Sequence, residues 1–135
     1  MDGQIQIMLI TTRDTGRWIV PKGWPIRGLM PRQVAAREAR EEAGVSGTVV
    51  GKKPIAKYTY SKRIEDEGSL DCEVSVFLLR VNRQKKTWKE QGQRKLGWFA
   101  PVEASALLTE PALSAVVLKI PNLLKAKRRN MARSL

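Results

Sequence analysis

Three glutamates stand close together in a chain that has few acidic residues. Glu38, Glu41 and Glu42 have the spacing i, i+3 and i+4, so a helix would place them on one face. Hard divalent cations such as Mg²⁺ are held by carboxylate oxygens and bind phosphate oxygens at the same time. A carboxylate face on a rigid helix therefore suits a metal-assisted reaction at a phosphate group. The alternative interpretation of this acidic stretch is a solvated surface helix without a ligand.

The helix that must carry these glutamates is predicted over residues 31–43. Pro31 is tolerated in a first helical turn, good helix formers fill the interior, and Gly44 is suited to end the helix. An irregular loop precedes this helix, and a polar, acidic connection is expected over residues 63–71. Strands are predicted over residues 5–10, 17–20, 48–50, 55–60, 72–81 and 96–99, and further helices over 102–108 and 111–120, the last ended by Pro121. This order of elements predicts the α+β class.

Composition excludes several kinds of chemistry. The chain has 135 residues, enough for one domain with a hydrophobic core, and no histidine, which excludes a Ser-His-Asp triad and a His-ligated zinc site. Cys72 is the single cysteine, so no intramolecular disulfide can form. A formal net charge of +12 predicts a polyanionic partner. We expect a cytoplasmic location, because the sequence lacks a signal-peptide pattern and any apolar run near the ~20 residues of a membrane helix.

Residues 23–45 resemble the signature box of the Nudix hydrolases. That box runs Gly, five residues, Glu, seven residues, then Arg-Glu-U-x-Glu-Glu-x-Gly-U, where U is a bulky aliphatic residue. Ala39 is a lenient match at one aliphatic position, and Leu29 stands where the family normally has its first glutamate. The segments 17–23, 46–48 and 88–99 resemble the diphosphoinositol and diadenosine polyphosphate branch, and the likeness spans about residues 5–108. The residues of the box that fall in register are Gly23, Arg37, Glu38, Glu41, Glu42, Gly44 and Val45.

The resemblance implies roles for particular residues. Glu38, Glu41 and Glu42 would be metal ligands, with Mg²⁺ as the cofactor and Mn²⁺ as a substitute. Catalytic roles would fall to Glu41, Glu38, Arg37 and Glu90. Arg37 would orient the carboxylates. Glu90 is a candidate metal ligand or base, and its alternative is an exposed loop acid. Substrate contacts would come from Lys22, Arg17, Gly23 and Arg94. For Arg17 and Arg94 the alternative is a solvated surface charge.

The resemblance also implies a fold. It is an α/β/α sandwich of the α+β class, in which the catalytic loop–helix–loop and a C-terminal helix pack on a mixed β-sheet. We expect a Nudix domain over residues 1–121 and a basic C-terminal tail over residues 122–135. Relatives usually have a strand before the one predicted at residues 5–10, where this chain has only residues 1–4. The sheet is then shortened, completed by a neighbouring chain, or left with an open edge.

The expected function is hydrolysis of a pyrophosphate linkage in a nucleoside or inositol polyphosphate, by metal-dependent attack of water at phosphorus. The alternative is a catalytically weak Nudix-fold module that binds a polyanion or nucleic acid. The expected partner is a phosphorylated small molecule. Nucleic-acid binding through the basic tail is less favoured, membrane attachment is not expected, and the protein would be a monomer or homodimer.

Overall fold

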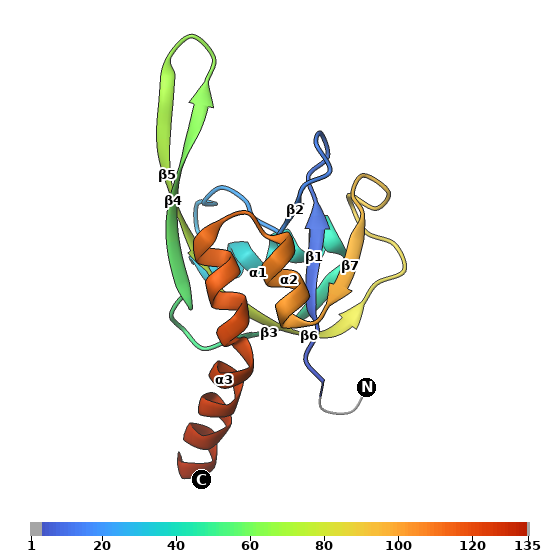
Figure 1. Ribbon diagram of the computed structural model, residues 1–135, viewed down its shortest axis with the longest axis vertical. Coiled ribbons are helices and arrows are strands. Elements are labelled where there is room, and N and C mark those ends of the chain that lie inside the picture. The colour runs from blue at the N-terminus through green and yellow to red at the C-terminus, as the bar shows by residue number, and fades with distance from the viewer. Residues whose placement is uncertain (1–3, 135) are drawn as a thin grey trace. The chain divides into compact units, whose positions relative to one another are not determined.

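The computed structural model describes the backbone of residues 4–134 and the side chains of residues 4–126. The chain divides into two compact units. The first unit contains both ends of the chain, up to Val20 and from Lys95 onward. The second unit is the continuous segment Pro21–Arg94. The elements of each unit are labelled in Figure 1.

A three-stranded antiparallel sheet forms the centre of the first unit. Strand β1 (Ile7–Thr11) lies between β2 (Trp18–Ile19) and β7 (Leu96–Phe99). The side chains of Leu9 and Ile10 are fully buried, as the run of apolar and β-branched residues predicts. The rings of Trp18 and Phe99 meet edge to face with their centroids 5.0 Å apart. These contacts tie the two ends of the chain into one core.

Two helices complete the first unit, α2 (Pro101–Leu107) and α3 (Pro111–Ser134). The hydroxyl groups of Ser105 and Ser114 lie 2.8 Å apart and link α2 to α3. The predicted end of the last helix at Pro121 is wrong, because α3 continues through this proline to Ser134 (Figure 1). Apolar residues explain the continuation, since the stripe on α3 extends past the proline and offsets the lost backbone hydrogen bond. Its members are Leu113, Val116, Val117 and Ile120, which are buried, and Leu124, which is half-buried.

The second unit contains two antiparallel strand pairs and one helix. Strand β3 (Val45–Val50) pairs with β6 (Leu78–Gln84), and β4 (Ala56–Ile64) pairs with β5 (Gly68–Val76). Helix α1 (Pro31–Ala43) precedes β3 directly and contacts it. The helix therefore occupies the segment that the sequence predicts, residues 31–43.

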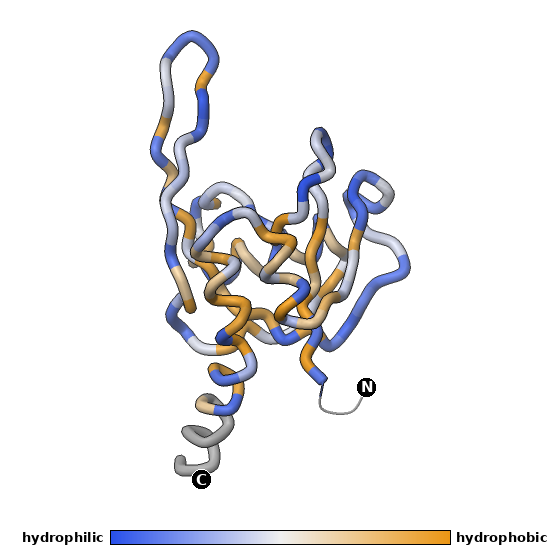
Figure 2. Tube along the Cα trace, in the orientation of Figure 1, coloured by the Kyte–Doolittle hydropathy of each residue, from blue (hydrophilic) through white to orange (hydrophobic). Residues whose placement is uncertain are grey.

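The β4–β5 hairpin corrects two predictions (Figure 1). The expected loop over residues 63–71 is mostly strand, since β4 reaches Ile64 and the turn covers only residues 65–67. The single strand expected over residues 72–81 is two strands, β5 and β6, separated at Phe77. Hydrophilic residues occupy the hairpin's turn in Figure 2, and this polarity made the segment resemble a loop. Cross-strand pairing, which sequence periodicity does not record, overrides that preference.

The order of strands and helices confirms the predicted α+β class. Residues 4–6 form no strand before β1, and residues 1–3 lie outside the described part, so the missing first strand stays a prediction. The division between a domain and a basic tail at residue 122 also stays a prediction. The side chains of its arginines lie outside the described residues. In the part of the chain that the structure describes, no helix has the length and apolar character needed to cross a bilayer.

Candidate active site

Helix α1 carries the predicted acidic face and is bounded by defined caps. At its start, the backbone N–H of Met30 donates to Oε1 of Gln33 at 2.7 Å. At its end, Gly44 adopts a left-handed conformation with φ of 69°, which side chains other than glycine rarely tolerate. A Cβ atom at Gly44 would also overlap the ring of Trp88. The glutamates are thus held on a helix whose two ends are fixed.

Glu42 is the buried member of the acidic face, with 7% of its surface exposed. Its Oε1 accepts a hydrogen bond from the backbone N–H of Lys22 at 3.1 Å. Its Oε2 lies 3.5 Å from Nη2 of Arg94. A buried carboxylate is retained only where hydrogen bonds and an opposite charge replace its hydration. Glu42 therefore joins the loop before α1 to the segment before β7.

The pKa of Glu42 is raised from 4.5 to about 7, mainly because burial disfavours the charged carboxylate. The Lys22 N–H and the charge of Arg94 oppose the rise, and the negative charges of Glu38 and Glu90 add to it. Burial outweighs both stabilising partners. At neutral pH this side chain is consequently divided between its protonated and charged forms.

Arg94 connects two carboxylates from different parts of the second unit. Besides its contact with Glu42, its Nε donates to Oε1 of Glu90 at 3.2 Å. The backbone N–H of Glu90 in turn donates to the carbonyl oxygen of Glu41 at 3.0 Å, which anchors the loop on the last turn of α1. Glu90 therefore lies beside the acidic face. Its role as ligand or base, and the contact of Arg94 with phosphate, stay predictions.

Glu41 has a cation on either side. Nε of Arg37, one helical turn earlier, lies 3.2 Å from Oε1 of Glu41. Nζ of Lys89 lies 3.9 Å from Oε2 of the same carboxylate. The geometry allows Arg37 to orient this carboxylate, which is the role that the family resemblance implies for Arg37.

Glu38 lies against the loop that precedes the helix. A Cβ atom at Gly23 would overlap the carboxylate of Glu38, so the backbone at Gly23 closely approaches the flexible end of this side chain. The pKa of Glu38 is raised, first by burial and then by the negative charges of Glu41 and Glu90. Negative charges on α1 and on the loop at residue 90 thus act together on Glu38 and Glu42.

The cationic residues predicted to bind substrate occupy different places. Nζ of Lys22 lies 4.1 Å above the centre of the Tyr60 ring, a cation–π contact with β4. Arg17 belongs to the first unit, where its backbone N–H donates to Oγ1 of Thr12 at 3.1 Å. Substrate binding by Lys22 and Arg17 stays a prediction, and the acidic cluster of the second unit is assembled without Arg17.

Comparison with known proteins decides the family. The sequence profile of the NUDIX domain matches residues 1–119 of this chain. The chain belongs to the NUDIX family. Its acidic helix α1 and the loop carrying Gly23 lie in the segment that resembles the signature box, so the predicted membership is confirmed.

Plant members of the NUDIX family are similar in sequence. Nudix hydrolase 16, mitochondrial, from Arabidopsis thaliana is 33% identical over 103 residues, which cover 74% of this chain and 56% of that protein. Nudix hydrolase 12, mitochondrial, from the same plant is 27% identical over 107 residues, covering 77% of this chain and 52% of the relative. The chain therefore spans about half the length of these curated relatives.

Two solved structures show that the NUDIX chain has a known fold. The Ap4A hydrolase of C. elegans superposes with a TM-score of 0.58 at 16% identity, covering 92% of this chain and 89% of that one. The ORF135 protein of E. coli gives a TM-score of 0.60 at 20% identity and covers 93% of this chain and 85% of its own. These likenesses establish the fold, and the branch of the family to which the chain belongs stays a prediction.

The donor set of this NUDIX protein suits a hard divalent cation, because all four candidate groups are carboxylates and their proximity helps to raise the pKa of Glu38 and of Glu42. Within the described residues, no three acidic, cysteine or histidine side chains converge closely enough to hold a metal ion. Instead, arginine or lysine contacts Glu41, Glu42 and Glu90. Metal binding would therefore require these carboxylates to exchange some of their cationic partners for the ion.

Sequence reasoning missed two contributors to the site. Lys89 contacts Glu41, and Tyr60 lies beneath Lys22. The position of Lys89 next to the candidate Glu90 was a usable signal. Tyr60 gave no signal, because its contact with Lys22 joins two segments that lie almost 40 residues apart in the sequence.

Proposed function

We propose that this protein hydrolyses a pyrophosphate linkage in a nucleoside or inositol polyphosphate, with a divalent metal ion and by attack of water at phosphorus. The observation that carries the proposal is the clustering of Glu38, Glu41 and Glu42 on α1 with Glu90 beside them, in the segment that resembles the signature box. Family membership supports hydrolase chemistry. The name of the C. elegans protein of similar fold, an Ap4A hydrolase, supports a polyphosphate substrate.

Each part of the cluster has a chemical task in this proposal. Mg²⁺ or Mn²⁺, when bound, would neutralise phosphate charge and polarise the attacking water. Glu38 and Glu41 would hold the ion, Glu42 would complete the ligand set from its buried position, and Arg37 would orient Glu41. The net charge of +12 would draw a highly charged substrate toward the protein.

The test is a screen for phosphate products with Mg²⁺ and with Mn²⁺. The panel contains dinucleoside polyphosphates, nucleoside diphosphate sugars, nucleoside triphosphates and diphosphoinositols. We expect turnover of at least one class, and a loss of about 100-fold or more in kcat/KM for the Glu41→Gln variant. The matched control is Glu103→Gln, which removes an exposed acid of α2 and should retain full activity. Equal activity of the Glu41→Gln variant and wild type would contradict the metal-helix assignment.

Leu29 favours a second candidate function. It stands where the family normally has a glutamate, so one acidic group of the usual site is missing. The side chain of Leu29 is partly exposed, with 36% of its surface accessible. The candidate is a catalytically weak module that binds a polyanion or nucleic acid. It predicts no turnover across the panel, together with affinity for a polyanion that falls steeply as salt increases.

A cytoplasmic location is likewise a proposal, which fractionation of cells that produce the protein would test.

A further inference from the structure

Trp24 is an exposed aromatic residue directly after the glycine that contacts Glu38. Its surface is 53% exposed, more than that of the other strongly exposed tryptophan, Trp98, at 39%. Leu70, on β5, is 46% exposed. Trp24 and Leu70 border the same hollow, so these apolar surfaces form a lining rather than scattered single residues.

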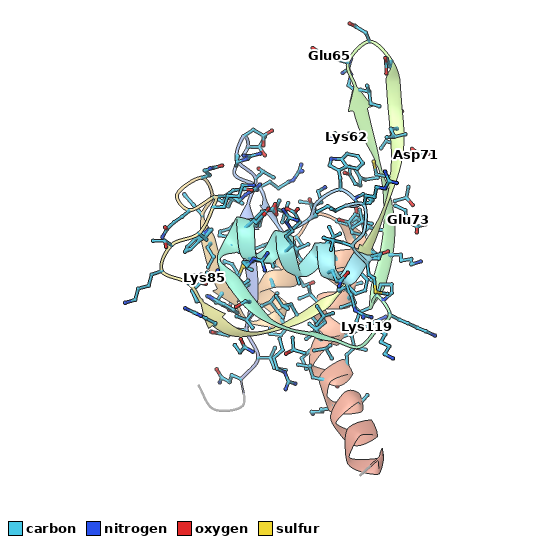
Figure 3. All side chains as sticks on the ribbon, turned by 180° about the vertical axis from the view of Figure 1, so that it is seen from behind. Lys62, Glu65, Asp71, Glu73, Lys85 and Lys119 are labelled. Atoms are coloured by element: carbon cyan, nitrogen blue, oxygen red, sulfur yellow. The ribbon has the colours of Figure 1, made fainter. Side chains whose placement is uncertain are left out.

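The hollow has a volume of about 620 Å³ and belongs wholly to the second unit. This volume lies within the ~300–1,000 Å³ typical of small-molecule sites. Figure 3 labels Lys62 and Glu65 on the β4–β5 hairpin, with Glu65 at its turn. The residues that line the hollow are Trp24, Lys62, Arg63, Ile64, Glu65 and Leu70.

The chemistry of this lining selects among the substrates considered above. An indole ring with apolar neighbours favours a flat aromatic group, because stacking and burial of apolar surface both contribute. The ring of an inositol phosphate is neither flat nor aromatic and would gain little from the indole. The cations Lys62 and Arg63 suit the phosphates attached to an aromatic group.

We propose that this hollow binds the nucleobase of a nucleoside polyphosphate, with Trp24 as the stacking surface. The inference rests on the proposed function, because it takes a polyphosphate as substrate, and it narrows the class to nucleotides. Only one residue separates Trp24 from Lys22, whose backbone N–H holds Glu42, and Gly23 between them contacts Glu38. A base on Trp24 would thus place its phosphates beside the acidic cluster.

Lys62 would change its contact when a nucleotide binds in the hollow. Its Nζ lies 4.5 Å above the centre of the Trp24 ring, so the cation covers this aromatic face before a ligand arrives. A stacked base would replace that cation–π contact. The displaced ammonium group would then be available to a phosphate of the same ligand, which replaces one favourable contact of lysine by another.

Calorimetry with two ligands tests the proposal without requiring turnover. The ligands are adenosine 5′-(α,β-methylene)triphosphate, which carries a base, and inorganic tripolyphosphate, which does not; both are titrated with Mg²⁺ present. Wild type should bind the nucleotide more tightly. The Trp24→Ala variant should lose about ten-fold in affinity for the nucleotide and less than about two-fold for tripolyphosphate, while Trp24→Phe should recover most of the loss.

Trp98→Leu is the control, since it changes an exposed tryptophan of β7 in the first unit and should alter neither affinity. The proposal is overturned if wild type binds neither ligand, if it does not prefer the nucleotide, or if Trp24→Ala weakens both ligands equally or changes neither. Failure of the proposed hydrolase function has a different signature, namely preference for the nucleotide that depends on Trp24, with no turnover of any substrate in the panel.

Discussion

Arg94 and Glu42 form an ion pair in which both side chains are almost entirely removed from solvent. Nη2 of Arg94 lies 3.5 Å from Oε2 of Glu42, and the exposed fractions of the two side chains are 10% and 7%. The same guanidinium group donates to Glu90. One arginine therefore balances the charge of two carboxylates on separate segments of the second unit, and its removal would leave both without that partner.

The first prediction concerns this arginine. Replacing Arg94 by Met should lower the free energy of unfolding by about 3 kcal/mol, because it leaves the buried Glu42 and the half-buried Glu90 without this opposite charge. Chemical denaturation measures the change. The control is Lys57→Met, which breaks the exposed pair between Lys57 and Glu73 at 3.8 Å and should cost at most about 1 kcal/mol. Similar losses in the two variants would show that the Arg94 pair is not energetically distinct.

Glu42 should make stability depend on pH in the absence of metal. Its pKa is raised from 4.5 to about 7 in the folded protein. Between these pH values the folded protein keeps a proton on Glu42 that the unfolded chain has released, so the free energy of unfolding should fall as pH rises from 4.5 through 7. Urea denaturation with a metal chelator measures this slope.

The Glu42→Gln variant isolates the effect of that proton. Its stability relative to wild type should increase as the pH is raised across this interval, since glutamine cannot release a proton. Glu103→Gln should follow the wild-type profile, because Glu103 is exposed on α2. Parallel pH profiles for wild type and Glu42→Gln would contradict the assignment.

Two glycines beside α1 should respond differently to alanine. In Gly23→Ala the new Cβ would meet the flexible end of Glu38, which can move aside, so the stability loss should stay below about 1 kcal/mol. The displaced carboxylate should weaken metal binding. In Gly44→Ala, a left-handed backbone and the rigid Trp88 ring should together cost about 2 kcal/mol or more.

Thermal denaturation with and without Mg²⁺ separates these effects of the two glycines. Gly23→Ala should keep a melting temperature near that of wild type without metal and lose most of the shift produced by Mg²⁺. Gly44→Ala should melt early under both conditions. A full Mg²⁺ shift in Gly23→Ala would mean that the position of Glu38 does not matter for the ion.

Lys89 should compete with a metal ion for Glu41. Its Nζ lies 3.9 Å from Oε2 of that carboxylate, so Lys89→Met should raise the affinity for Mg²⁺ a few-fold by removing a nearby positive charge. Calorimetric titration with Mg²⁺ measures the change, and Lys86→Met, on the same exposed loop, is the control. Unchanged or weaker binding in Lys89→Met would argue against this competition.

The sequence predicts helix α1 at its observed bounds because both ends have specific residues. Pro31 suits a first turn, and Gly44 provides a left-handed cap. Pro121 is also such an end signal, but it leads to a wrong prediction. A proline acts locally, whereas the apolar stripe of α3 extends beyond it to Leu124. Local signals are therefore reliable where packing agrees with them and fail where packing opposes them.

The candidate site could also be predicted only in part from the sequence. The spacing of Glu38, Glu41 and Glu42 is enough by itself to indicate a shared helical face. Burial distinguishes Glu42 from the other two, and that burial depends on Lys22 and Arg94, which lie far from it in the sequence. A periodic pattern records which residues share a face, but it does not record which of them is covered by distant segments.

The loop before α1 is attached to the acidic helix through its main chain. The hydrogen bond that fixes Glu42 comes from the backbone N–H of Lys22, while the lysine's ammonium group rests on Tyr60. Any amino acid except proline supplies the same N–H group. A changed side chain at position 22 would thus leave the attachment of loop to helix intact, and under the proposed function this position is free to vary with the substrate.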